Sequence, residues 1–178
     1  FEQRTKDEGT LYFLRNTKVD DGDLQSLVLS TPAGAVGLSL RGKKTGFLST
    51  RLDGRIISIE TQGNVTVDNQ VVVSTNAHVG LVSLDKYDIR ESSAILVLPF
   101  SEGELRLLVP TSWQGVSCVV GEIRDGYWRE LGSKEVKVDD RTMEIVIEHD
   151  DTLTTFIVIY DRGVDIEDIF ARFLSKNK

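Results

Sequence analysis

Short apolar runs separated by turn residues repeat along most of the chain, about every ten residues. Within many runs apolar and polar residues alternate, as between Glu144 and Glu148, which is the pattern of a strand with one buried face. Turn signals such as Asp53-Gly54 and Asp68-Asn69 separate neighbouring runs. The pattern predicts strands over 11–14, 24–29, 35–40, 46–52, 55–61, 65–67, 71–74, 79–84, 94–100, 104–109, 116–122, 127–131, 134–138, 142–148 and 154–160.

Two of these runs have apolar residues at consecutive positions. They are Val-Val-Val at 71–73 and Phe-Ile-Val-Ile at 156–159, and strands buried on both faces have this composition, so we expect both at the centre of a sheet. Helical patterns do not alternate with the strands, which disfavours a parallel α/β sheet. We therefore predict an all-β protein, an antiparallel β-sandwich of jelly-roll or immunoglobulin-like type.

The C-terminal residues depart from the strand pattern. Asp165 is a good N-cap, and the apolar residues that follow recur with the spacing i, i+3, i+4, i+7, i+8. These residues are Ile166, Ile169, Phe170, Phe173 and Leu174. The spacing predicts a short helix whose apolar stripe packs on the sandwich; the alternative is that the stripe docks on a neighbouring domain or a partner chain.

These elements divide the chain into three parts. Residues 1–9 are charged and lack periodicity, so they are predicted to be a linker or a frayed N-terminus. Residues 10–162 are predicted to form the β-sandwich domain and residues 163–178 the helix packed on it. Two small sandwiches joined near Pro110 are the alternative, which we disfavour because the second would have a thin core.

Composition and charge narrow the class of protein further. The chain of 178 residues has 20 Val, 12 Ile and 14 Thr but five Ala, which suits pleated sheets and excludes an all-helical fold. Its net charge of −7 and its lack of Lys/Arg clusters argue against nucleic-acid binding. No apolar run approaches the roughly 20 residues that span a bilayer, so no membrane insertion is expected. The chain begins at Phe1 rather than Met, as a processed chain or an excised domain would.

Motifs for catalysis or for metal binding are missing from the sequence. It contains no nucleophile elbow, no phosphate loop and no zinc-protease motif. His78 is expected in a structural role, and His149 with Asp150 in a solvated turn rather than a cation site. The single cysteine, Cys118, lies in an apolar run and is expected to be a buried structural thiol. We therefore predict no catalytic residue, no metal site and no cofactor.

Aromatic residues provide the candidate binding site. Trp113, Tyr127 and Trp128 lie close together in the sequence, beside turn signals, and they include both tryptophans of the chain. The simpler interpretation is that these rings pack in the sandwich core. The alternative is that they are exposed and stack against the C–H faces of sugar rings. On that interpretation Trp113, Tyr127 and Trp128 form a carbohydrate-binding site.

Four segments together resemble a known kind of domain. They are LSTPAGAVG at 29–37, VSLDKYDIRESSAIL at 82–96, LVPTSW at 108–113 and DGYWREL at 125–131. Their order and spacing are similar to those of the accessory C-terminal β-sandwich that follows the catalytic barrel in some glycoside hydrolases. One departure is that Ala33-Gly34-Ala35 replaces the usual Arg-Thr-Gln, so a role tied to that polar strand is in doubt.

This resemblance implies a function. It implies a non-catalytic module of a larger carbohydrate-active enzyme, which braces the catalytic domain of the same polypeptide or complex and has polysaccharide as a second expected partner. The alternative is an adhesive or structural surface domain without sugar chemistry. A free-standing hydrolase that uses paired carboxylates is disfavoured, because nothing in the sequence singles out two acids buried together.

Overall fold

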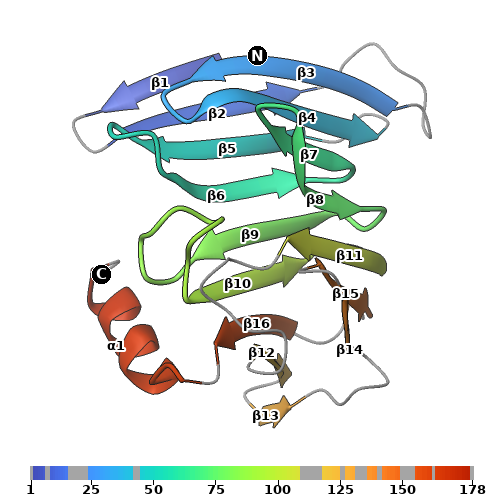
Figure 1. Cartoon of the computed structure of the whole chain (residues 1–178), viewed down its shortest axis with the longest axis vertical. Coiled ribbons are helices and arrows are strands. Elements are labelled where there is room, and N and C mark those ends of the chain that lie inside the picture. Colours follow the sequence, from blue (N-terminus) through green and yellow to red (C-terminus); the bar gives the residue numbers. More distant parts are fainter. Residues whose placement is uncertain are drawn as a thin grey trace.

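A computed structural model of the chain describes residues 2–6, 9–15, 24–41, 45–108, 118–124, 127–130, 136–139, 142–148, 155–161 and 163–176. These residues form two antiparallel β-sheets that lie face to face, and one C-terminal helix, α1 (Ile166–Lys176) (Figure 1). The prediction of an all-β sandwich with a short C-terminal helix is therefore confirmed.

The strands are stacked along the longest axis of the molecule. The nine-stranded sheet has the order β1 (Glu2–Lys6), β2 (Gly9–Arg15), β5 (Thr45–Arg51), β6 (Ile56–Thr61), β9 (Val79–Ser83), β10 (Ala94–Pro99), β16 (Thr155–Asp161), β12 (Cys118–Arg124) and β13 (Tyr127–Glu130). The seven-stranded sheet has the order β14 (Val136–Asp139), β15 (Thr142–Ile147), β11 (Gly103–Leu108), β8 (Gln70–Thr75), β7 (Asn64–Val67), β4 (Gly34–Arg41) and β3 (Leu24–Thr31).

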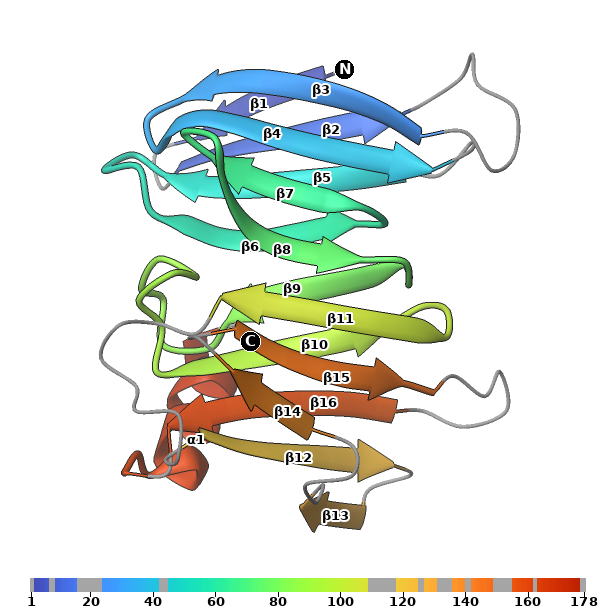
Figure 2. The same ribbon diagram turned by 45° about the vertical axis from the view of Figure 1, so that its right-hand side comes forward.

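Successive hairpins alternate between the two sheets. The pairs β1–β2, β5–β6 and β9–β10 belong to the nine-stranded sheet, and β3–β4 and β7–β8 belong to the seven-stranded sheet, which lies in front in Figure 2. The chain thus crosses between the sheets as it moves along the long axis. The last strand, β16, returns to lie between β10 and β12.

One continuous apolar core fills the space between the sheets. The alternation of β15 shows its origin: Ile145 and Ile147 are buried, whereas Val146 between them is 52% exposed. Buried side chains of both sheets belong to the same cluster, from Tyr12 on β2 to Ile159 on β16. The core includes Leu38, Leu48, Ile59, Val73, Leu81, Ile95, Leu105, Leu107, Met143 and Ile157.

The two runs with consecutive apolar residues lie where the sequence predicts. β8 is the middle strand of the seven-stranded sheet, and a register shift in its pairing with β7 accompanies the burial of both Val72 and Val73. β16 has neighbours on both sides, and it is covered on both faces: Ile157 and Ile159 face the core, and Val158 and Tyr160 face α1.

Helix α1 covers part of the outer face of the nine-stranded sheet. Asp165 caps it, because its Oδ1 accepts a hydrogen bond from the backbone N–H of Asp168 at 3.2 Å. Ile169 is buried against Val158 and Tyr160, and Ile166, Phe170 and Phe173 pack around the same cluster. The predicted apolar stripe therefore packs on the sandwich, with one correction: Leu174, near the C-terminal end of α1, is 58% exposed.

The first residues of the chain differ from the sequence prediction. The sequence predicts a linker or a frayed N-terminus over 1–9, but β1 pairs with β2 along its whole length, for example Arg4 with Leu11 and Thr5 with Thr10. No apolar side chain marks 2–6 as a strand. Its pairing depends instead on the backbone groups that the edge of β2 offers, and a sequence pattern does not show these.

Turn residues set the register of two hairpins as predicted. Asp68 and Asn69 both have positive φ angles, 48° and 67°, which a tight two-residue turn requires and which Asp and Asn tolerate. The other turn follows Asp53, where Gly54 has a φ of 93° and its N–H donates to the carbonyl oxygen of Arg51 at 3.0 Å.

The loop between β9 and β10 is fixed to the sheet by Asp88. This carboxylate is 4% exposed and accepts hydrogen bonds from Arg90 and from the backbone N–H of Ile56, the latter at 2.9 Å. Burial by itself would raise the pKa of Asp88, but the hydrogen bonds from Arg90 and Ile56 outweigh burial and lower this pKa below its ordinary value. An ionised Asp88 therefore ties the loop to the start of β6.

Candidate functional site

A row of polar side chains crosses the outer face of the seven-stranded sheet. Backbone register places Glu144 of β15 opposite Arg106 of β11, Arg106 opposite Ser74 of β8, and Ser74 opposite Asn64 of β7. Directly paired residues of antiparallel strands have their side chains on the same face. We call Glu144, Arg106, Ser74 and Asn64 the polar row.

Neighbours within the polar row bind one another. Arg106 Nη2 lies 3.2 Å from Glu144 Oε2, and Ser74 Oγ donates a hydrogen bond to Asn64 Oδ1 at 2.8 Å. The Arg106 side chain is still 61% exposed, so its guanidinium has further donors directed to solvent. The row is thus held in place by its own contacts and remains accessible.

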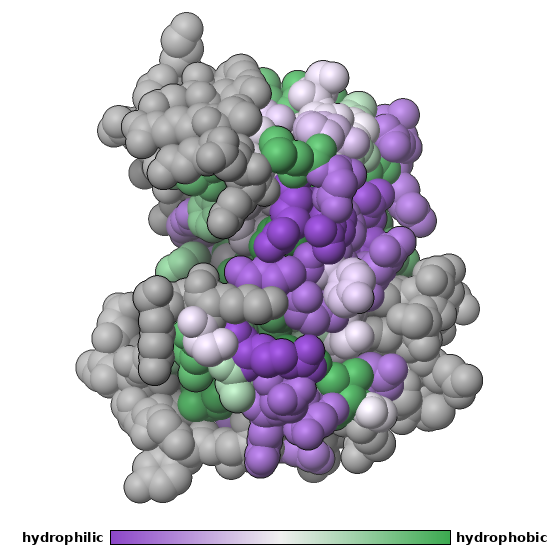
Figure 3. Space-filling view, turned by 90° about the vertical axis from the view of Figure 1, so that its left-hand side faces the viewer, coloured by the Kyte–Doolittle hydropathy of each residue, from purple (hydrophilic) through white to green (hydrophobic). Residues whose placement is uncertain are grey.

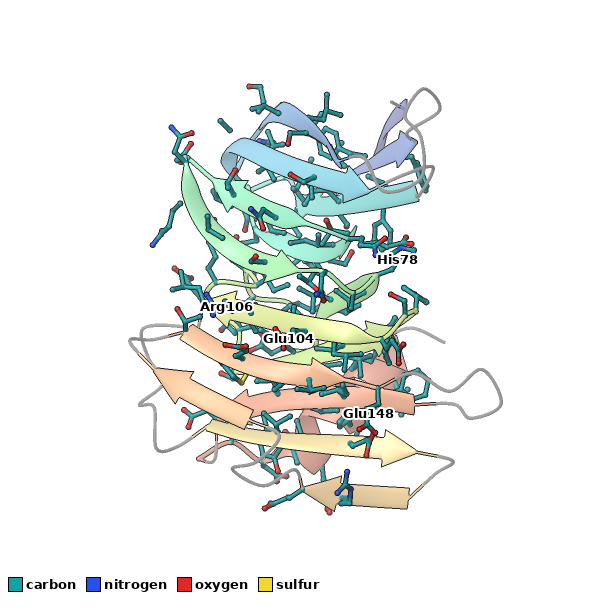
Figure 4. All side chains as sticks on the ribbon, turned by 90° about the vertical axis from the view of Figure 1, so that its right-hand side faces the viewer. His78, Glu104, Arg106 and Glu148 are labelled. Carbon is teal, nitrogen blue, oxygen red and sulfur yellow. The ribbon has the colours of Figure 1, made fainter. Side chains whose placement is uncertain are left out.

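A second pair of polar residues borders this row. Asn76 Oδ1 accepts a hydrogen bond from the backbone N–H of Glu104 at 2.7 Å, and the Asn76 carbonyl oxygen accepts one from Gln62 Nε2 at 2.9 Å. The side chains of Asn76 and Glu104 are exposed. Figure 4 looks onto this sheet and shows Glu104 and Arg106 on β11, with Glu148 beyond the end of β15.

The row and this pair enclose a shallow hollow of about 240 Å³. Its lining residues are Ser74, Thr75, Asn76, Glu104, Leu105, Arg106 and Glu144. The alternation of β11 explains why polar groups gather here: Leu105 and Leu107 point into the core, so Glu104 and Arg106 point outward. Two carboxylates, a guanidinium, an amide and a hydroxyl therefore converge on one surface, and together they can donate and accept hydrogen bonds.

His78 lies apart from this hollow and contacts residues of two neighbouring segments. Its Nε2 is 2.8 Å from Glu60 Oε1, and its ring centroid lies 5.1 Å from that of Phe100. The carbonyl oxygen of His78 accepts hydrogen bonds from the backbone N–H groups of Phe100 and Ser101. These contacts join β6 to the ends of β9 and β10, which is a structural role.

Aromatic and aliphatic side chains lie on the half of the nine-stranded sheet that α1 does not cover. Phe13 of β2 pairs with Phe47 of β5. On the same face, beyond Glu60 of β6 and Gly80 of β9, lie Leu98 and Phe100. Phe13 is 40% exposed and Phe100 is 47% exposed. We call Phe13, Phe47, Leu98 and Phe100 the uncovered apolar face.

The site residues predicted from the sequence are placed only in part. Tyr127 and Trp128 lie on β13, the edge strand of the nine-stranded sheet, where they pair with Arg124 and Ile123. Their side chains, all of Trp113, and the side chain of Cys118 are outside the described residues, so the carbohydrate-binding site stays a prediction. His149 and Asp150 also lie outside them.

The polar row was not predicted from the sequence, because each member by itself is an ordinary outward-facing polar residue of a strand. The available signal was alternation, which marks Arg106 and Glu144 as outward-facing. Cross-strand register, which brings them together, is set by the pairing of β11 with β8 and β15 and is not visible in any one strand.

Comparison with known protein families, with curated proteins and with solved structures found no match to this chain. Among the described residues, no three His, Cys, Asp or Glu side chains gather where they could hold a metal ion. In the part of the chain that the structure describes, no helix is both long enough and apolar enough to cross a membrane.

Proposed function

We propose that this β-sandwich is a non-catalytic glycan-binding module that works beside a catalytic domain in a carbohydrate-active enzyme. The observation that carries the binding role is the polar row with its hollow on the outer face of the seven-stranded sheet. The absence of catalytic motifs from the sequence supports the non-catalytic assignment.

The chemistry of the polar row suits sugar hydroxyls. A sugar hydroxyl both donates and accepts, and the row offers Arg106 as a donor and Glu144 as an acceptor. Ser74 Oγ can accept because its proton is donated to Asn64, and Glu104 beside the row is a further acceptor. Adjacent strands lie about 4.8 Å apart, which is close to the length of one sugar unit, so successive units of an extended chain can meet successive strands. Hydrogen bonds to the charged groups are the stronger ones.

The shape of the site favours a polysaccharide over a free monosaccharide. The hollow is shallow and lies on an open sheet face, so it buries little of any one ring. Binding then accumulates over several sugar units, with an affinity on the order of 0.1 mM for a short oligosaccharide. A module of this kind holds an enzyme close to its polymer and needs no enclosed pocket.

We expect wild-type protein to bind at least one member of a polysaccharide panel, and the Arg106→Ala variant to bind it about tenfold more weakly. Affinity electrophoresis identifies the polymer, and isothermal titration measures the affinity. Glu167→Gln is the control, because it changes the charge of an exposed side chain on α1 by one unit, and this side chain lines neither the hollow nor any other pocket described for this chain. Trp128→Ala tests the aromatic site predicted from the sequence.

The outcomes separate the hypotheses. No response to any glycan would support an adhesive or structural domain without sugar chemistry. If Trp128→Ala abolishes binding while Arg106→Ala leaves it unchanged, the binding site lies at β13 and the polar row is only a solvated sheet face.

A bracing role is favoured by the uncovered apolar face. Phe13 and Phe100 are each at least 40% exposed, on a sheet whose other half is already covered by α1. Large aromatic groups exposed on one sheet face can contact a neighbouring domain. We propose that a neighbouring catalytic domain covers this face as α1 covers the rest.

In the longer polypeptide we expect Phe13 and Phe100 to be several-fold better protected from hydroxyl-radical oxidation than in the isolated domain, because a neighbouring domain would shield both rings. Val28 and Val71, exposed on the opposite sheet, are the controls and should react equally in both samples. Equal oxidation of the two phenylalanines in both samples would contradict bracing through this face.

A further inference from the structure

A groove of about 540 Å³ lies between α1, the loop that joins β9 to β10, and the turn between β5 and β6. This size is typical of sites for small ligands. Figure 3 looks onto the side of the molecule on which α1 and this loop lie, and a band of hydrophilic residues runs down its described surface. Six of the groove residues matter here: Arg51, Arg55, Lys86, Tyr87, Arg172 and Phe173.

The groove concentrates positive charge in an acidic protein. Arg51, Arg55, Lys86 and Arg172 all line it, although the net charge of the chain is −7. They come from the end of β5, the start of β6, the β9–β10 loop and α1, so they meet only in the folded protein. A concave surface lined mostly by one sign of charge attracts ligands of the opposite sign.

The carboxylate that lines the groove, Asp85, is occupied by its own loop. Its Oδ1 accepts hydrogen bonds from Ser83 Oγ at 3.0 Å and from the backbone N–H of Tyr87 at 3.2 Å. Its Oδ2 accepts one from the backbone N–H of Ser93 at 2.8 Å. Asp85 therefore shapes the loop, and its hydrogen bonds are made within that loop rather than with the groove cations.

Three of the cations are held in position. Arg55 Nε lies 2.8 Å from Asp53 Oδ2, and Arg55 Nη1 donates to the carbonyl oxygen of Lys86 at 3.2 Å. Lys86 Nζ lies 5.4 Å from the centre of the Phe173 ring, within the range of a cation–π contact. Arg172 is paired with Asp168 one turn earlier on α1.

Arg51 differs from these three. Among the described residues it has no ion-pair partner, although it is half-buried at the rim of the groove. Its planar guanidinium can bind a carboxylate through two parallel hydrogen bonds. Tyr87, which is 56% exposed, adds an aromatic ring to the same groove, and such a ring can stack against the C–H face of a sugar.

We propose that this groove binds the carboxylate of an acidic sugar, a uronic acid residue, with Arg51 as the principal anion-binding group and Tyr87 as the ring-stacking group. The juxtaposition of Arg51, whose charge is balanced by no ion pair among the described residues, with the exposed Tyr87 in one groove carries the proposal. The groove is formed by α1 and the nine-stranded sheet, whereas the polar row lies on the other sheet. The two sites can therefore be tested separately.

The experiment is a titration of wild-type protein with a trisaccharide of galacturonic acid, followed by backbone amide NMR shifts. We expect saturable shifts in the β9–β10 loop and in α1. The Arg51→Ala variant should bind at least tenfold more weakly at these positions, and Tyr87→Ala several-fold more weakly. Glu167→Gln, which changes an exposed side chain of α1 that does not line the groove, is the control and should bind this trisaccharide there as wild type does.

Two further ligands test the chemical class. A neutral galactose trisaccharide should leave the loop and α1 unshifted, and inorganic phosphate at the same ionic strength should compete weakly. Equal binding of the neutral sugar, equal affinity for phosphate, or full binding by Arg51→Ala would each overturn the proposal. The urea unfolding midpoint of each variant is also measured. A midpoint close to that of wild type shows that the variant is folded, so that a loss of binding reflects the groove itself.

Discussion

Replacing Asp88 with Ala is expected to lower the free energy of unfolding by about 2–4 kcal/mol. The Asp88 carboxylate is buried and accepts hydrogen bonds from three nitrogens of Arg90, at 2.7 to 2.9 Å, and from the backbone N–H of Ile56. Without the carboxylate, the backbone N–H of Ile56 loses its hydrogen-bond acceptor, and the guanidinium of Arg90 loses its counter-charge. Urea denaturation of wild type and variant measures the difference.

Asp53 provides the matched control for Asp88. It also precedes an arginine by two positions and pairs with it, since Arg55 Nε lies 2.8 Å from Asp53 Oδ2. Asp53 itself is exposed to solvent, and Arg55, which is half-buried, keeps its hydrogen bond to the carbonyl oxygen of Lys86. Asp53→Ala should therefore change stability less than Asp88→Ala. If the two variants lost similar stability, the claim that burial makes Asp88 important would be wrong.

The same site gives a pH dependence whose sign follows from its pKa. Burial alone would raise the pKa of Asp88, yet hydrogen bonds from Arg90 and Ile56 lower it below the ordinary value. The ionised group therefore stabilises the fold fully above the ordinary carboxyl pKa of about 4, and this stability is lost as the pH falls through the lowered value. Between pH 5 and pH 3, wild type should lose more stability than Asp88→Asn.

Replacing Ile145 with Ala is expected to cost about 2–5 kcal/mol of unfolding free energy. Ile145 is 1% exposed, in the core between the sheets, and truncation leaves a cavity that neighbours such as Leu105 and Met143 fill only in part. Denaturation in urea gives the value.

Val146, the next residue on β15, is the internal control for this substitution. Its side chain is 52% exposed on the outer face, so Val146→Ala should cost well under half as much as Ile145→Ala. A larger loss at Val146 than at Ile145 would mean that β15 has the opposite face toward the core.

Local patterns were sufficient to locate the secondary structure of this chain. Each predicted strand corresponds to one described strand, and the expected helix is α1. This agreement has a physical cause: alternation within a strand and the spacing of Ile166, Ile169 and Phe170 each reflect a face buried by that element alone. β1 was not predicted because its residues are polar and show no apolar periodicity. Leu174 was assigned to the buried stripe because helical periodicity does not show which residues of a stripe the sheet covers.

The candidate sites depended on long-range pairing. Arg106 and Glu144 are 38 positions apart in the chain, and only the pairing of β11 with β15 brings them to 3.2 Å. Arg51 and Arg172 are farther apart still, yet both line the groove beside α1. No local signal distinguishes Arg51, Arg106 and Arg172 from the other arginines of the chain.

The sequence by itself determined which segments other than β1 are strands, where apolar and polar residues alternate within them, and that an amphipathic helix lies near the C-terminus. These properties follow from side-chain periodicity and turn chemistry, which act over a few residues. Only the tertiary structure decided that hairpins alternate between sheets, that β16 returns between β10 and β12, and that polar groups form a row on one sheet and a cationic groove beside the other. Those properties follow from strand order and register, because backbone hydrogen bonding allows many pairings and the burial of one shared core selects among them.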